Sequence, residues 1–400
     1  MLFDIITDKG IYQYDNITGI ITYQSQPLKI ETTNDIKECK NLKIVLGHAC
    51  NSRCKYCLQP NHTPCDTPSK KEYEVFKITL DKVIKDNDFK TITFYGGEPL
   101  LYWDYIKDIV ESFKDKITNF GMLSNGIAMT MDKAKFIEQN NMGVNMSHDG
   151  PGQWLRGIDP LHENSPSRKA IYELYKMEGK ISFSPTITSY NYNILDIVQR
   201  YDDLGFHNCK IHHSKPYMAT ISNSPMNQYL ITEKEYDKYY ESILESVNRW
   251  GIKRFLNYIN VISDIIKNHN MALAGRPNNI KNKCIATRNK VRSIDLFGNS
   301  YICHNMHVDD NVFPGIRNIK ENLITGENYG YVPITSWLDR NEYCKQCIAA
   351  IHCLGGCPIR NKELHQANCI GNYAFHAATM TIAFGQMFES SIEIRMSENQ

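Results

Sequence analysis

Three cysteines that directly follow a short apolar segment constrain this chain more than any other part of its sequence. Residues 42–46 predict a β-strand that leads into a loop with the spacing C-x3-C-x2-C, at Cys50, Cys54 and Cys57. Cysteine thiolates in short runs of this kind hold iron–sulfur clusters. Three thiolates leave one iron of a four-iron cluster without a protein ligand, and an open coordination position is typical of a catalytic metal site.

A zinc site is the alternative interpretation of these cysteines. Zinc in a structural site takes four ligands, usually from Cys and His. No fourth ligand stands at the usual distance after Cys57, and His62 and Cys65 are the only nearby candidates. The loop therefore favours an iron–sulfur cluster, a hypothesis that other parts of the chain have to support.

The composition is that of an ordinary globular chain. Its 400 residues allow two or three domains, and its apolar and charged fractions of 42% and 22% are average. A net charge of +1 gives no reason to expect nucleic acid or a membrane surface as a partner. No apolar run is long enough to cross a bilayer, and residues 1–8 are unlike a signal peptide. We therefore expect a cytoplasmic protein with no nucleic-acid or membrane partner.

The number of cysteines is high for a cytoplasmic chain. Thirteen cysteines indicate metal or redox chemistry rather than a disulfide framework. Three lie in the first loop and seven lie between Cys284 and Cys369. Cys39, Cys65 and Cys209 are left over, and we interpret them as small buried hydrophobic residues.

Predicted strands and helices alternate from residue 41 to residue 212. The strands are expected at 42–46, 91–95, 120–123, 143–146, 181–183 and 209–212, with helices between them. Repeated βα units of this kind indicate a parallel sheet. Six of them fit an α/β fold with a partial (β/α)6, TIM-like barrel. In such barrels the reacting side chains lie at the C-terminal ends of the strands.

Short polar segments follow three of these strands. Gly96-Gly97-Glu98-Pro99 follows the second strand, Ser124-Asn125-Gly126 the third, and Ser147-His148-Asp149-Gly150 the fourth. Glycines let a ligand approach the backbone, and a carboxylate such as Glu98 can pair with an ammonium group. Each segment alone is an ordinary turn, but their order along the sheet predicts one shared site.

The cysteine loop and the strand-end segments together resemble the radical S-adenosylmethionine (SAM) enzymes. The signature of that family is C-x3-C-x-aromatic-C, with Tyr56 in the aromatic position. The resemblance implies a [4Fe–4S] cluster on the three cysteines that binds SAM and cleaves it to a 5′-deoxyadenosyl radical, which abstracts a hydrogen atom. It also implies these SAM contacts: Tyr56, Gly96, Gly97, Glu98 and Pro99, with Glu98 at the amino group, and Ser124, Asn125, Ser147 and Asp149 towards the carboxylate and ribose.

The remaining cysteines have the order C…G-x4-C…C-x2-C-x5-C-x3-C…C. C-x2-C pairs alone are equally typical of zinc sites, but the full order resembles the SPASM extension of radical SAM enzymes, which binds two auxiliary [4Fe–4S] clusters. The resemblance implies Cys284, Cys303 and Cys357 for cluster one, and Cys344, Cys347, Cys353 and Cys369 for cluster two. Relatives with eight ligands have one more Cys shortly before Cys284, and residues 276–280 contain none. Cluster one therefore has an open iron, or another group such as Cys209 or a His completes it.

These motifs divide the chain into five expected segments. They are a small N-terminal β-rich segment at 1–40, the partial barrel at 41–230, a helical bridge at 231–280, the Cys-rich SPASM domain at 281–375, and a C-terminal helix and tail at 376–400. Residues 11–14 and 20–23 predict a hairpin in the first segment. In peptide-modifying relatives an N-terminal domain often binds a leader peptide, but a plain edge hairpin is equally compatible with so short a segment.

The resemblance implies a peptide maturase as the leading function. Such an enzyme would act on a peptide or protein substrate with a leader segment, form a thioether or another crosslink, and receive electrons from a donor such as flavodoxin or ferredoxin. An anaerobic sulfatase maturase is the alternative, although those enzymes carry an Asp directly after the position of Cys303, where this chain has His304. A small-molecule dehydrogenase or epimerase is a third possibility. A non-catalytic electron carrier would have no use for the segment at 96–99.

Overall fold

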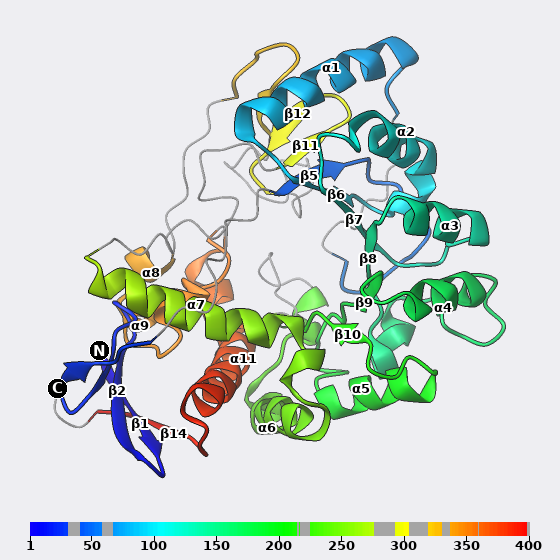
Figure 1. Ribbon diagram of the computed structural model, residues 1–400. Helices are drawn as coiled ribbons and strands as arrows, with labels where there is room; N and C mark the ends of the chain where they lie inside the picture. Colours follow the sequence, from blue (N-terminus) through cyan, green and yellow to red (C-terminus); the bar gives the residue numbers. More distant parts are fainter. Residues whose placement is uncertain are drawn as a thin grey trace.

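The computed structural model of the chain describes residues 1–30, 41–57, 67–213, 216, 225–275, 293–303, 319–329, 337–358 and 360–397. These residues form a nine-stranded sheet with helices on its outer side, a second sheet of five strands, and a group of helices between the two sheets (Figure 1). Within this described part, no helix combines the length and the apolar character that crossing a bilayer requires.

Six parallel strands form the main part of the larger sheet, in the order of the sequence. They are β5 (Asn41–Val45), β6 (Thr91–Tyr95), β7 (Asn119–Ser124), β8 (Gly143–Met146), β9 (Ile181–Phe183) and β10 (Lys210–Ile211). The helices that connect them follow the outer side of the curved sheet (Figure 1): α1 (Lys70–Asn87), α2 (Trp103–Phe113), α3 (Met131–Gln139), α4 (Arg168–Lys176) and α5 (Ile194–Asp203). The predicted partial (β/α)6 barrel is therefore confirmed.

The barrel helix α1 shows how its cap and its apolar face together define a helix of the barrel. At α1 the backbone N–H of Glu72 donates to Ser69 Oγ at 3.3 Å, and the N–H of Ser69 donates to Glu72 Oε2 at 2.8 Å. This is the capping box that the sequence predicts. The buried face of the helix packs on strands whose alternate residues are also buried, for example Leu42 and Ile44 of β5.

A hairpin from the Cys-rich region extends the barrel sheet beyond β5. Strand β11 (Ser293–Asp295) pairs parallel to β5, and β12 (Asn299–Tyr301) and β13 (Ile319–Asn322) continue the sheet with antiparallel pairing. Cys303 follows β12 after one residue. The strand that leads into the first cysteine loop is thus also bonded to the strand pair that precedes Cys303.

Long helices connect the barrel to the second sheet. They are α6 (Glu233–Trp250), α7 (Leu256–Leu273) and α11 (Lys362–Phe388), accompanied by the short helices α8 (Trp337–Arg340), α9 (Glu342–Lys345) and α10 (Ala350–Cys353). Four 3-10 turns complete the helical elements: η1 (Pro99–Tyr102), η2 (Gly150–Leu155), η3 (Pro225–Tyr229) and η4 (Ile252–Arg254). Helix α11 contributes Phe375 to the barrel core and Phe384 to a second core beside the smaller sheet.

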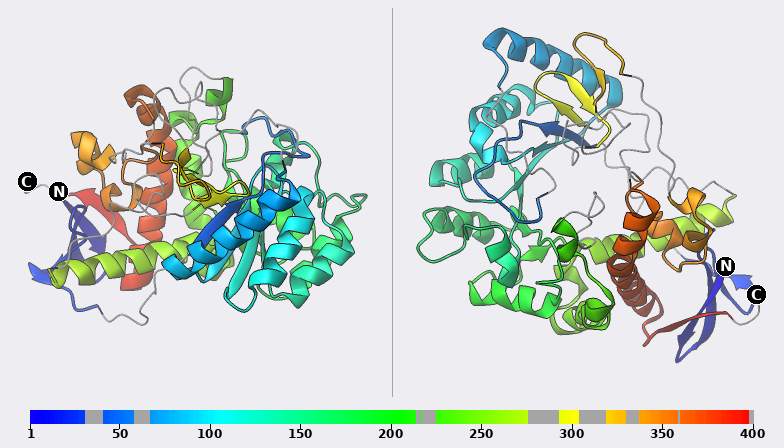
Figure 2. Two further views of the ribbon diagram at one scale, coloured as in Figure 1. Left: turned by 90° about the horizontal axis from the view of Figure 1, so that it is seen from above. Right: turned by 180° about the vertical axis from the view of Figure 1, so that it is seen from behind.

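The smaller sheet joins the two ends of the sequence, which lie close together (Figure 2). Its order is β14-β1-β2-β3-β4, with β1 (Leu2–Thr7), β2 (Gly10–Asp15), β3 (Ile21–Tyr23), β4 (Gln26–Pro27) and β14 (Glu393–Met396). The predicted hairpin is present as β2 and β3, whereas the partner strand β14 is not predicted by the sequence.

The predicted boundary after residue 375 falls inside α11, because apolar positions continue along that helix without interruption. The division into segments otherwise stays a prediction.

Candidate active site

The cysteine loop begins where β5 ends, at the C-terminal edge of the sheet. The N–H of Leu46 still donates to Tyr95 O of β6 at 2.9 Å. Beyond it the loop pairs with the segment after β6, because the N–H of Gly97 donates to Gly47 O and the N–H of Glu98 donates to Ala49 O, both at 2.9 Å. The first two predicted motifs therefore lie against each other along their backbones.

Glycines make this close approach of the two segments possible. A Cβ atom on Gly96 would lie 2.3 Å from Gly47 O, and one on Gly97 would lie 2.3 Å from Ala49 O and 2.5 Å from His48 O. Gly96 also has a φ of +150°, which side chains rarely adopt. The two glycines thus provide room for the cysteine loop itself, in addition to any approach of a ligand. Pro99, buried, begins the turn η1 directly after Glu98.

The thiols of the loop lie in a partly buried environment. Burial, together with the charges of Glu98, Cys54 and Cys57, raises the pKa of Cys50 to about 11, although the N–H of Ser52 donates to its sulfur at 3.4 Å. A metal-bound cysteine must lose its proton, and the positive charge of the metal replaces it. The environment therefore fits three thiolates that share a cationic group.

Within the described residues, no three His, Cys, Asp or Glu side chains converge as ligands of one metal ion. The ligands of an iron–sulfur cubane bind different irons, so they do not have to converge on one point. The thiols of Cys50, Cys54 and Cys57 lie within electrostatic range of one another. This arrangement is compatible with a cluster on the three cysteines.

Glu98 is the most strongly held of the predicted SAM contacts. Its side chain is 1% exposed. Oε1 accepts from Leu100 N at 3.0 Å and Ser124 Oγ at 2.7 Å, and Oε2 accepts from Asn125 N at 2.7 Å. A carboxylate has about four acceptor positions, so one remains for a ligand. Burial raises the pKa of Glu98 and these hydrogen bonds lower it, and a bound ammonium group would further stabilise the charged form.

Asn125 connects Glu98 with the cysteine loop. Its Nδ2 donates to Asn51 Oδ1 at 2.8 Å and lies 3.8 Å from Cys50 Sγ. The next strand end joins them, because the N–H of Ser147 donates to Ser124 O at 2.8 Å. The structure therefore brings Cys50, Glu98, Ser124, Asn125 and Ser147 together at one edge, as the order of the motifs predicts.

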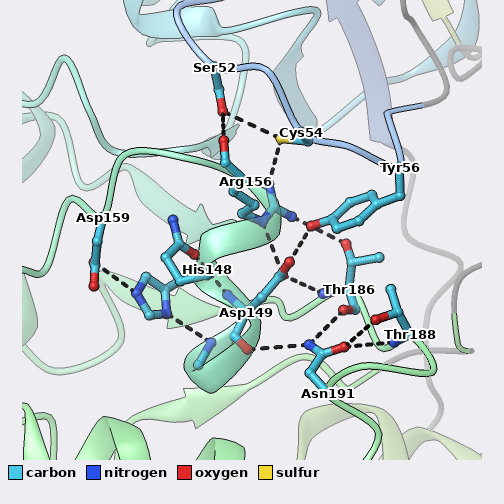
Figure 3. Close-up of polar contacts among 12 residues, drawn as sticks. Ser52, Cys54, Tyr56, His148, Asp149, Arg156, Asp159, Thr186, Thr188 and Asn191 are labelled. Atoms are coloured by element: carbon cyan, nitrogen blue, oxygen red, sulfur yellow. Dashed lines mark hydrogen bonds and ion pairs between the residues drawn. The ribbon is translucent and has the colours of Figure 1, made fainter. Parts of the chain in front are cut away.

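Asp149 belongs to a buried network that includes Tyr56 and Arg156 (Figure 3). Its carboxylate, 0% exposed, accepts hydrogen bonds from the hydroxyl of Tyr56 and from Thr186 N at 2.8 Å, and its Oδ1 forms an ion pair with Arg156, whose Nε lies 3.0 Å away. Burial alone would lower the pKa of Arg156, but the negative charge of Asp149 raises it above its ordinary value. Asp149 and Arg156 thus form a buried ion pair.

The same network reaches the sulfur of the second cysteine (Figure 3). Arg156 Nη1 lies 3.8 Å from Cys54 Sγ, and its guanidinium lies 5.6 Å from the centre of the Tyr56 ring. Ser52 Oγ lies 3.4 Å from the same sulfur and donates to Arg156 O at 2.8 Å. The sequence does not single out Arg156, Ser52 or Thr186, because no spacing connects them to the cysteines.

These contacts argue against the function expected for Asp149, a contact with SAM. Both carboxylate oxygens already accept hydrogen bonds from the chain itself. The ribose contact that the resemblance implies would need an acceptor position beside these three partners. The contacts instead favour Asp149 as the residue that holds Tyr56 and Arg156 in place.

The cysteines expected for cluster two lie together. Burial and the charges of Cys353 and Cys369 raise the pKa of Cys344 to about 11 and that of Cys347 to about 12. Cys344 lies in α9, Cys353 ends α10 and Cys369 lies in α11. The hydrogen bonds within this group include one between Cys344 Sγ and His365 Nε2 at 3.4 Å. Three helices and the segment between α9 and α10, which carries Cys347, therefore supply four thiols that fit one cluster with four protein ligands.

The cysteines expected for cluster one are placed only in part. Cys284 lies outside the described residues. Cys303 and Cys57 both lie within electrostatic range of Tyr95. Burial lowers the pKa of Lys43 to about 8, and the nearby Cys303 acts in the opposite direction. Cys357 lies near Arg340. The described residues therefore leave cluster one a prediction.

Cys209 is a poor candidate for the missing ligand. It precedes β10, so it lies at the N-terminal edge of the sheet, in the barrel core and 3% exposed. Arg254 Nη2 lies 3.6 Å from its sulfur, and burial raises the pKa of the Cys209 thiol to about 11. These contacts agree with the interpretation of Cys209 as a buried small residue.

We expect Gly97→Ala to separate the cysteine loop from the sheet edge. The added Cβ would meet two backbone oxygens that cannot rotate away, so the free energy of unfolding should fall by about 1–3 kcal/mol or more. Urea denaturation under anaerobic conditions measures this change. Gly143→Ala is the matched control, since no atom lies within 4 Å of its Cβ position. Equal effects of the two substitutions would contradict the contact described here.

We expect Asp149→Asn to lower the free energy of unfolding by about 3–5 kcal/mol, because it leaves the buried Arg156 without its ion-pair partner. The exposed Asp203→Asn should change it by less than about 0.5 kcal/mol. Denaturation and SAM binding are measured on the same preparations. Weakened SAM binding with unchanged stability would instead support a direct ribose contact.

Comparisons with known proteins agree with this geometry. Residues 44–213 match the model of the "Radical SAM superfamily". Among curated proteins, the radical SAM cyclopropyl synthase TigE of Paramaledivibacter caminithermalis is 24% identical over 49% of this chain, and the match spans 46% of TigE, less than half its length. The cysteine-type anaerobic sulfatase-maturating enzyme of Clostridium perfringens is 25% identical over 77% of this chain and 85% of its own length.

Solved structures share the fold beyond the matched domain. The structure of anSMEcpe with bound AdoMet and the Cp18Cys peptide has a TM-score of 0.60 and 16% identity, and covers 87% of this chain and 99% of that one. Streptococcus suis SuiB bound to the precursor peptide SuiA has a TM-score of 0.54 and 14% identity, and covers 80% of this chain and 72% of that one.

The predicted family, fold class and cofactors are thereby confirmed, whereas the residues that bind the cofactors stay predictions. Residues 44–213 belong to the radical SAM superfamily, whose enzymes use a [4Fe–4S] cluster and SAM.

Proposed function

We propose that this radical SAM enzyme modifies a peptide or protein substrate and thereby forms a thioether or another crosslink. The observation that carries the proposal is the convergence of Cys50, Glu98 and Asn125 at one edge of the barrel, with Cys344, Cys353 and Cys369 all within electrostatic range of Cys347. The structures of anSMEcpe and SuiB named above each contain a bound peptide, and their likeness to this chain covers 87% and 80% of it. It supports a peptide as the substrate class.

The cysteine loop and the strand ends have separate tasks in this proposal. Cys50, Cys54 and Cys57 hold the [4Fe–4S] cluster. When bound, the cluster and SAM supply a one-electron cleavage that yields a hydrogen-abstracting radical. Glu98 accepts the ammonium group of SAM at its remaining acceptor position, and Ser124 and Asn125 hold that carboxylate in place. Ser147 and the backbone of Gly96, Gly97 and Pro99 form the surrounding wall.

Asp149, Tyr56 and Arg156 stabilise the loop on its other side. Arg156 keeps a positive charge beside the Cys54 sulfur, and Asp149 fixes the direction of that guanidinium through Nε. Because all three side chains are mostly or fully buried, the loop is held in one arrangement before any ligand binds. A preorganised site of this kind loses less free energy when its cofactor binds.

The second cysteine set would hold the two auxiliary clusters, which when bound would supply an acceptor for the electron that remains on the substrate after a bond forms. Cluster two would have four thiolates, Cys344, Cys347, Cys353 and Cys369, and cluster one would have Cys284, Cys303 and Cys357. An open iron on cluster one could hold a substrate thiolate, which suits thioether formation. A cavity of about 690 Å³ is lined by Cys347 and Cys369, and an electron-transfer partner of cluster two would approach from there.

Oxidation of a protein cysteine or serine to formylglycine is the second candidate. It is favoured by the likeness to the C. perfringens sulfatase-maturating enzyme, which extends over most of both chains.

Mass spectrometry of a cysteine-containing peptide after reaction distinguishes crosslink formation from formylglycine formation. A crosslinked peptide loses hydrogen and retains its sulfur, whereas formylglycine formation removes the sulfur and leaves an aldehyde.

Replacing Cys50, Cys54 and Cys57 by Ala should abolish the formation of 5′-deoxyadenosine from SAM and a reductant, while auxiliary iron stays bound. Chromatography of the nucleoside and iron analysis measure both. Cys209→Ala is the control, and it should keep SAM cleavage and all iron because Cys209 lies in the barrel core. Continued SAM cleavage in the triple variant would overturn the assignment of the first cluster.

Glu98→Gln should weaken SAM binding by roughly tenfold or more. A hydrogen bond to a charged group contributes about 1.5–3 kcal/mol, and about 1.4 kcal/mol corresponds to one decade of affinity. Gln keeps the shape of the side chain but removes the charge that pairs with the ammonium group. Equilibrium binding to the reconstituted enzyme measures the change. Unaltered affinity would leave Glu98 with a structural function only.

A further inference from the structure

The N-terminal sheet lies directly against the cysteines expected for cluster two. Strands β1 to β3 share an apolar core with Cys344 and with the residues around α10. The sequence leaves two interpretations of residues 1–40 open, a leader-binding segment or an edge hairpin. The contacts of one residue, Asn16, favour a third interpretation, in which the segment supports the cysteines of cluster two.

Asn16 follows β2 and is fully buried. Its Nδ2 donates to Lys345 O and to Cys347 O, both at 2.7 Å. These carbonyls lie on the short segment between Cys344 and Cys347. Both hydrogens of the amide are therefore used to hold the backbone of the C-x2-C pair. With the amide reversed, its oxygen would face two carbonyl oxygens, so the contacts fix its orientation.

The turn that carries Asn16 is itself rigid. Asp15 Oδ1 accepts from Ile17 N at 2.8 Å and Thr18 N at 3.1 Å, and Gly19 N donates to Asp15 O at 2.8 Å. Gly19 adopts a φ of +81°, and a Cβ there would lie 3.1 Å from Ile351 Cδ1. The turn therefore fits closely against α10 as well as against the C-x2-C pair.

Further contacts join the sheet to the same region. The hydroxyl of Tyr14 lies 3.4 Å from His352 Nε2, next to Cys353. Ile21 N donates to His269 Nδ1 at 3.0 Å, and His269 Nε2 donates to Leu28 O at 2.8 Å, which ties the sheet to α7. The N-terminal sheet is thus bonded to two of the elements that surround the cysteines.

We propose that Asn16 is a positioning residue of the second auxiliary cluster, and that the N-terminal sheet is a structural part of that cluster site. The inference rests on the proposed function in one respect, namely that Cys344, Cys347, Cys353 and Cys369 hold a cluster. Asn16 fixes the backbone of the C-x2-C pair through its two hydrogen bonds to the Lys345 and Cys347 carbonyls. The thiols of Cys344 and Cys347 are thereby kept facing those of Cys353 and Cys369. Residues that orient metal ligands in this way commonly change metal affinity by roughly 10- to 100-fold.

The test compares Asn16→Asp, Asn16→Ala and the control Gln13→Ala. Asn16→Asp has nearly the same shape but presents a carboxylate oxygen to two carbonyl oxygens, and Gln13 lies on the same sheet and contacts only Asp4 among the described side chains. All three changes are made in the protein that lacks Cys50, Cys54 and Cys57, so that only auxiliary iron is present. Iron content, EPR spectra of the reduced protein and the rate of iron loss to a chelator are measured.

The expected result is that Asn16→Asp loses auxiliary iron to the chelator roughly tenfold faster than the control, with Asn16→Ala in between. Equal rates for all variants would overturn the inference. Alkylation of Cys347 in the metal-free protein, followed by mass spectrometry, gives a second measurement. Faster alkylation in Asn16→Asp supports the inference, and an unchanged rate contradicts it.

The two measurements separate this inference from the proposed function. If the parent protein binds no auxiliary iron, the proposed function is wrong for this cysteine set, and the alkylation rate still reports whether Asn16 holds the C-x2-C pair. Circular dichroism of each variant establishes that the barrel is folded. A variant that retains the barrel but loses auxiliary iron supports Asn16 as a positioning residue.

Discussion

The backbone contact between the cysteine loop and the Gly96–Gly97 segment is the constraint on which the rest of the site depends. Two loops that follow neighbouring strands bond to each other through Gly97 N and Glu98 N, and side chains at the two glycines would prevent it. The contact determines where Cys50 lies relative to Glu98. Ser124 and Asn125 of the next strand then hold the Glu98 carboxylate, so three strand ends act as one unit.

Charge is distributed unevenly around the loop. On one side Glu98, almost fully buried, lies beside Cys50, accepts hydrogen bonds from neutral donors of the described chain, and has the charge of Lys133 within electrostatic range. On the other side Asp149 is compensated by Arg156, which also lies near Cys54. Burying a charge without a close partner is unfavourable, and the ammonium group of SAM would give Glu98 such a partner. The uneven distribution therefore agrees with the direction in which the proposed cofactors would bind.

Much of the fold could be predicted because local signals agree with the tertiary structure. The strand–helix alternation gave the six parallel strands, and the capping box at Ser69 gave the start of α1. Motifs at strand ends identified Glu98, Ser124 and Asn125, because parallel strands bring their ends to one edge. Arg156 could not be predicted, since it reaches Cys54 from a turn about a hundred residues later. The same holds for β14 and for Asn16, whose partners lie at the far end of the sequence.

The pairing of β1 with β14 has a consequence for the order in which the protein assembles. A chain is synthesised from its N-terminus, and early domains fold first. The barrel strands can pair as soon as they are made, and β1 can pair with β2, whereas the pair of β1 with β14 must wait until β14 has been made. Contacts between residues so far apart in sequence form slowly. The β1–β14 edge of the N-terminal sheet would therefore form after the barrel and α11, later than the pairs among β1 to β4 that carry the Asn16 turn.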